Sequence, residues 1–122
     1  MSHAHDTNHA DGLDSMQPCI DACRRCHETC LHTAMVHCLA AGGERVEANH
    51  FRLMINCAEI CQTSSNFMLS DSAYCRQLCT LCAEICDACA DSCAKVAGLE
   101  ACAKACRECA DSCRTMSGVK AK

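Results

Sequence analysis

Cysteines recur along residues 75–93 at alternating steps of four and three residues. Because an α-helix turns about 100° per residue, these steps keep every sulfur in one stripe on one face of a helix. A β-strand would need steps of two. No Gly or Pro interrupts the stretch, and its alanines favour helix. The spacing therefore predicts a helix with a row of thiols along one side, formed by Cys75, Cys79, Cys82, Cys86, Cys89 and Cys93.

The same spacing occurs twice more in the chain. The stretch nearer the N-terminus carries Cys19, Cys23, Cys26 and Cys30. The stretch nearer the C-terminus carries Cys102, Cys106, Cys109 and Cys113. Continuing the alternating steps of the N-terminal stretch past Cys30 reaches Thr33 and then His37. Cys38 lies about 100° off this stripe, at its edge. We therefore expect His37 to continue the stripe and Cys38 to fit it less well.

A fourth stretch has fewer cysteines but keeps the rhythm. Between residues 44 and 69 only Cys57 and Cys61 are thiols, and the same steps extend to His50, Met54, Ser64 and Met68. A lone His or Met on an apolar face is usually core packing. Because these residues are in register with the thiols, His50 and Met54 are candidate copper or zinc ligands.

Several kinds of metal chemistry use many thiolates. Thiolate is a soft ligand that selects Cu(I), zinc or iron–sulfur clusters. Structural zinc sites and iron–sulfur clusters place CxxC pieces in knuckles and loops, whereas here they lie in helices. Rows of thiolates on rigid helices suit two-coordinate Cu(I). No βαβ pattern, Ser-His-Asp set or Gly-rich phosphate loop is evident, so we expect no enzyme activity.

Turn-forming residues divide the chain into four helices. The first is expected from about Ser15, with Pro18 in its first turn, as far as residue 41. Helices over residues 44–69, 73–97 and 99–115 follow, separated by Gly and Ser-Asp-Ser turns. Amphipathic helices with short connections predict an all-α, antiparallel four-helix bundle with a cysteine-lined core.

Composition sets the limits of this bundle. We expect a disordered tail over residues 1–13, a bundle over 14–117 and a C-terminal tail over 118–122. The first tail holds His3, His5 and His9, which is consistent with a solvated tail or with metal binding.

The cysteine count bears on the compartment. The chain has 17 cysteines, an odd number that cannot pair completely within one chain. The N-terminus lacks an apolar signal-peptide segment, and no stretch has membrane length. Both observations favour a reducing cytoplasm. The net charge of −4 argues against nucleic-acid binding.

Helices carrying CxxxCxxCxxxC in a bundle resemble the bacterial copper storage proteins, and the missing signal peptide resembles their cytosolic branch. The resemblance covers residues 19–113. It implies storage of many Cu(I) ions per chain, loading by a small copper carrier or low-molecular-weight thiol, and a homo-oligomer, commonly a tetramer. The alternative is a general thiol-rich buffer or sensor for zinc or another soft metal. An iron–sulfur electron carrier is a third hypothesis, and it requires a coloured, iron-containing protein. The candidate ligands are Cys19, Cys23, Cys26, Cys30, Cys38, Cys57, Cys61, Cys75, Cys79, Cys82, Cys86, Cys89, Cys93, Cys102, Cys106, Cys109, Cys113, His37, His50 and Met54.

Overall fold

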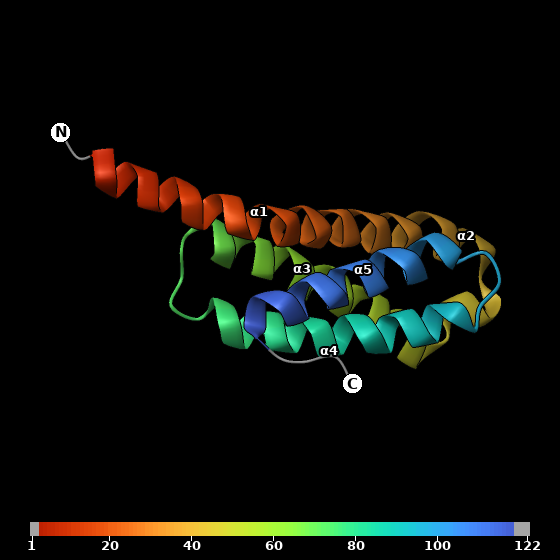
Figure 1. The fold of residues 1–122 in the computed structure, drawn as a ribbon. Coiled ribbons are helices and arrows are strands. Elements are labelled where there is room, and N and C mark those ends of the chain that lie inside the picture. Colours follow the sequence, from red (N-terminus) through yellow and green to blue (C-terminus); the bar gives the residue numbers. More distant parts are fainter. Residues whose placement is uncertain (1–2, 119–122) are drawn as a thin grey trace.

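The computed structural model describes the backbone of residues 3–118 and the side chains of residues 14–118. Four long helices make up most of the described backbone: α1 (His3–His32), α3 (Ala48–Leu69), α4 (Cys75–Ala94) and α5 (Glu100–Ser117). Each packs against the helix before and after it, and α5 returns to α1, so the four enclose a common interior (Figure 1). The predicted four-helix bundle is therefore confirmed. Among the described residues, every helix is too short or too polar to cross a lipid bilayer.

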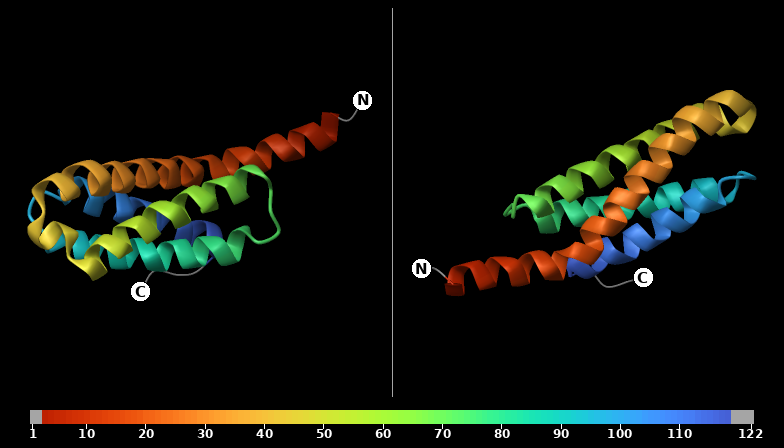
Figure 2. Two further views of the ribbon diagram at one scale, coloured as in Figure 1. Left: turned by 180° about the vertical axis from the view of Figure 1, so that it is seen from behind. Right: turned by 90° about the horizontal axis from the view of Figure 1, so that it is seen from above.

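Helix α1 is longer than predicted. It begins at His3, so the expected start near Ser15 is wrong, and Pro18 lies inside the helix. Proline lacks an N–H and crowds the preceding turn, which bends a helix without necessarily ending it. Figure 2 shows a bend in the N-terminal half of α1, with the N-terminal part projecting past the bundle. The side chains of His3, His5 and His9 and residues 119–122 lie outside the described residues, and the disorder expected for the tails stays a prediction.

The end of the first helix contains a π-helical turn. Between α1 and the short α2 (Leu39–Ala41) lies η1 (Thr33–Cys38), in which the backbone is π-helical. A π-turn has one residue more than an α-turn and so rotates the chain that follows. As a result Cys38 is fully buried and His37 is exposed, the reverse of the predicted register.

Two connections meet at one end of the bundle. The chain turns at Gly42 and Gly43, both with positive φ, and continues through η2 (Gly43–Val46). A guanidinium N–H of Arg45 donates to the Ala97 carbonyl at 2.6 Å and joins this turn to the α4–α5 loop. Helix α3 then begins later than predicted, because the Glu47 carboxylate accepts hydrogen bonds from the first free N–H groups, including that of His50 at 3.0 Å.

The core of the bundle consists mostly of sulfur. All cysteines except Cys75 are buried, and all 17 are free thiols. The fully buried larger side chains are few: Ile20, Met54, Met68 and Leu99. Alanines such as Ala83, Ala90 and Ala110 fill the gaps between helices. Protonated thiols behave as small hydrophobes, so the interior that supports the fold is also the candidate site.

Candidate metal centre

The buried thiols form five overlapping groups. Within each group all sulfur atoms lie within 4.8 Å of one another, close enough to hold one ion together. Taken along the bundle, the groups are Cys26, Cys30, Cys57 and Cys106; Cys26, Cys57, Cys61 and Cys86; Cys61, Cys82, Cys86 and Cys109; Cys23, Cys82, Cys109 and Cys113; and Cys19, Cys79 and Cys113. Every group takes its sulfurs from at least three helices, so the fold assembles each one.

Neighbouring groups share members. The first two groups share Cys26 and Cys57, and the second and third share Cys61 and Cys86. The same pattern continues to the last group, which shares one sulfur with its neighbour. The groups are therefore one continuous column of thiols, with no boundary between separate sites.

The spacing of the sulfurs matches the size of a metal ion with thiolate ligands. A metal–thiolate bond of about 2.3 Å places two sulfurs of one ion about 3.8 Å apart in tetrahedral geometry and about 4.6 Å apart in linear geometry. The closest pairs across helices are Cys30 with Cys106 and Cys61 with Cys86, each at 3.5 Å. Sulfurs of Cys26 and Cys57 lie 3.7 Å apart. The metal-free column therefore requires only small adjustments to bind an ion.

Thiol–thiol hydrogen bonds and burial shift the pKa values of the column in both directions. The hydrogen bond with the Cys106 thiol is the main cause that lowers the pKa of Cys89 to about 5. Contact with Cys30 lowers the pKa of Cys102, but the Cys93 thiol and burial outweigh it and raise this pKa to about 12. Burial also raises the pKa of Cys38 above its usual value. A buried column of this kind keeps many protons at neutral pH, and a bound cation must displace them.

We expect the metal-free bundle to lose stability as the pH rises above about 9. An unfolded Cys thiol ionises near 9.0, whereas folded Cys102 keeps its proton up to about 12. Between these values the folded state binds more protons, so the free energy of unfolding falls by about 1.4 kcal/mol per pH unit for each such thiol. Urea unfolding of the reduced protein between pH 7 and 11, followed by circular dichroism, measures this. A free energy of unfolding that stays level or rises with pH would contradict the prediction.

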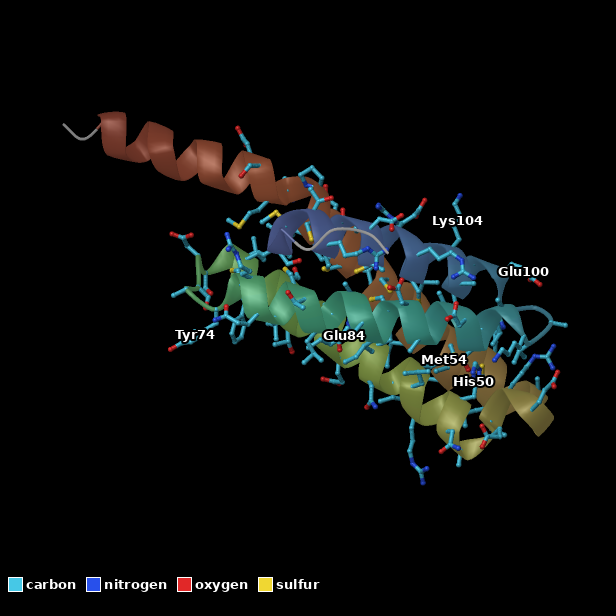
Figure 3. The ribbon with its side chains drawn as sticks, turned by 60° about the horizontal axis from the view of Figure 1, so that its bottom comes forward. His50, Met54, Tyr74, Glu84, Glu100 and Lys104 are labelled. Carbon is cyan, nitrogen blue, oxygen red and sulfur yellow. The ribbon has the colours of Figure 1, made fainter. Side chains whose placement is uncertain are left out.

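The end of the bundle near η1 has a different set of ligands. Cys38 directs its thiol to the Met54 sulfur at 3.9 Å. His50 is buried one turn away on α3, and its Nδ1 lies 2.6 Å from the Ser92 hydroxyl, whereas its Nε2 has no hydrogen-bond partner among the described residues. Figure 3 shows His50 and Met54 side by side at this end. A buried nitrogen without a partner is costly, so a ligand for Nε2 would stabilise this end.

The opposite end is filled by thioethers. Met68 is buried, and the partly buried Met16, Met116 and Cys75 pack against the core. The Cys75 thiol donates to the Phe67 carbonyl at 3.2 Å. Methionine fills irregular space well, and the arrangement is that of a packed end.

The structure separates the predicted site residues. Most cysteines enter the column; His50, Met54 and Cys38 gather at one end; and His37 lies outside the bundle wall. The thiols of Cys89 and Cys93 lie 4.0 Å apart and, like Cys102, are outside the five groups. Sequence reasoning missed Ser92, because only the packing of α4 on α3 brings its hydroxyl to His50.

Comparisons with known proteins give one family. The model of a family described as copper storage protein matches residues 6–118. A comparison with curated proteins finds no match.

Several solved structures are similar to the chain. A protein from Nitrosospira multiformis is 58% identical with a TM-score of 0.85, over 88% of this chain and 98% of that one. A Cu(I)-bound copper storage protein, BsCsp3, is 37% identical with a TM-score of 0.78, over 84% and 98% of the two chains. A cytosolic copper storage protein from Streptomyces lividans, with five coppers, is 28% identical with a TM-score of 0.79, over 89% and 97%.

Proposed function

Since the chain belongs to the copper storage protein family, we propose that it stores many Cu(I) ions inside its bundle, held by cysteine thiolates. One observation carries the proposal: the buried sulfurs form a continuous column in which neighbouring groups share ligands. A structural metal site needs only one closed group of four. Soft thiolates in a dry interior favour a soft monovalent ion.

The role is one of sequestration without catalysis. Each bound thiolate carries one negative charge and each Cu(I) one positive charge, so bridging thiolates keep the buried interior neutral. We expect the protein to act in the cytoplasm, where thiols stay reduced. The relative from Streptomyces lividans is described as cytosolic. Loading by a small copper carrier or low-molecular-weight thiol, and assembly as a homotetramer, complete the proposal.

The alternative function is a general thiol-rich buffer or sensor for zinc. Zinc also accepts four thiolates at these sulfur–sulfur distances, so geometry alone does not separate the two metals. Competition does: we expect Cu(I), added anaerobically, to displace bound zinc completely and to fill the column in the presence of excess zinc. Metal analysis and thiol counting after gel filtration provide the measurement. Zinc that resists displacement by stoichiometric Cu(I) would rule out the copper proposal.

A further inference from the structure

Two histidines meet on the outer surface of the π-turn. The rings of His32 and His37 contact each other edge to face, with centroids 5.4 Å apart. Both side chains are exposed, and neither forms a hydrogen bond or ion pair with another described residue. Both rings face the outside of the bundle, whereas Cys38, the next residue after His37, is buried inside it.

The pair exists because of the backbone. In an α-helix, residues five apart point about 140° away from each other, too far to share a ligand. In a π-turn, hydrogen bonds join residues five apart, so such residues lie roughly one turn above each other. The π-helical conformation of residues 33–38 therefore brings the two imidazoles onto one face.

The surroundings of the pair select the kind of ion. Glu28 lies one turn before His32, but no carboxylate among the described residues joins the two imidazoles in a group of three ligand atoms within 4.8 Å, so the pair lacks the oxygen ligands that a hard cation requires. The neighbouring exposed side chains are apolar or carry a thioether: Leu31, Met35, Val36 and Leu39. Imidazole nitrogens bind copper, zinc and nickel, and apolar surroundings with a thioether at Met35, between the two histidines in the sequence, favour the soft monovalent Cu(I) among these ions.

We propose that His32 and His37 form a surface Cu(I) site, separate from the thiol column, that binds copper outside the bundle wall. The inference rests on the proposed storage function, because it takes Cu(I) as the ion. Two neutral imidazoles bind more weakly than shared thiolates, so the site fills after the column at equilibrium. Its position on the π-turn, next in sequence to Cys38, places weakly bound copper at the end that holds His50 and Met54.

The test uses the full reduced chain labelled with ¹⁵N-histidine under anaerobic conditions. Cu(I) is added as its acetonitrile complex beyond saturation of the thiolates, and imidazole resonances are followed by NMR. We expect His32 and His37 to shift together at the same copper concentration. Two ligands on one face reinforce each other, so in His32→Ala the His37 shift should need at least about tenfold more copper. The same should hold for His32 in His37→Ala.

Arg25→Ala, an exposed change on the same helix, is the matched control and should leave both shifts at their wild-type copper concentration. A His37 shift that is unchanged in His32→Ala overturns the pair, as does the absence of any shift in the wild-type rings. Those outcomes would leave ordinary edge-to-face packing. The ultraviolet absorbance of thiolate-bound copper is recorded in the same titration, so failure of the storage function shows separately as a missing thiolate signal.

Discussion

Anaerobic titration of the reduced protein should saturate the thiolates at about 17 Cu(I) per chain, one for each cysteine. The physical reason is charge: a buried column tolerates little net charge, and equal numbers of thiolates and Cu(I) ions give neutrality. Isolated two-thiolate sites would leave one negative charge each and give about half that capacity. Saturation at one to four ions per chain would contradict storage.

Single replacements sharpen this prediction. Cys57 belongs to two groups, so Cys57→Ala should remove more than one copper per chain. Cys75 belongs to none and is only partly buried, so Cys75→Ala is the matched control and should remove one copper at most. Circular dichroism of the metal-free variants checks that both remain folded. Equal losses from the two variants would mean that the sites are independent and that the column is not shared.

Replacing both His37 and His50 with Ala should slow copper loading and release by roughly tenfold or more, while the total capacity stays nearly unchanged. We expect copper to enter the column at the end that holds His50, because neutral ligands hold Cu(I) weakly and exchange it quickly. His50 supplies a buried nitrogen without a partner beside Met54 and Cys38. Even the loss of a hydrogen bond to a metal-binding histidine commonly costs 10–100-fold in metal affinity. Stopped-flow absorbance of the copper–thiolate bands measures the rate.

A matched variant at the other end of the bundle tests at which end copper enters. Met68 and Met116 pack against the core there, so we expect the variant with both replaced by Ala to load at the wild-type rate. Metal-free circular dichroism identifies any loss of folding from the buried Met68. Slow loading of the methionine variant together with normal loading of the histidine variant would contradict the prediction, because it would show that copper enters at the methionine end.

The sequence predicted the bundle because the period of the cysteines is the period of a helix. The same period was misleading at residue 37. There the chain inserts a π-turn, and the buried positions become Cys30, Ala34 and Cys38, spaced by four and four. On an α-helix, two consecutive steps of four would rotate the side chains away from the stripe. This spacing was the signal in the sequence that the backbone departs from an α-helix here. Helix α1 extends through Pro18 because a bend accommodates the proline ring, which sequence rules treat as a boundary.

Contacts between helices were beyond sequence reasoning. The hydrogen bond between His50 and Ser92 joins residues 42 positions apart, and no local pattern marks Ser92. The ring pair of His32 and His37 depends on a backbone conformation that intrinsic propensities do not predict. The column itself followed from the sequence, since its members share one stripe on each helix.

The sharing of sulfurs between neighbouring groups has a consequence for how copper moves. An ion held by Cys26 and Cys57 is already bonded to two members of the next group, so it advances by exchanging one thiolate at a time. Each such step would keep the ion bonded to at least one shared sulfur. Cu(I) ions would then move along the column from one group of thiolates to the next. An empty site anywhere in the column would be filled by successive short displacements of its neighbours. A single entrance would therefore be enough to fill and to empty the whole column.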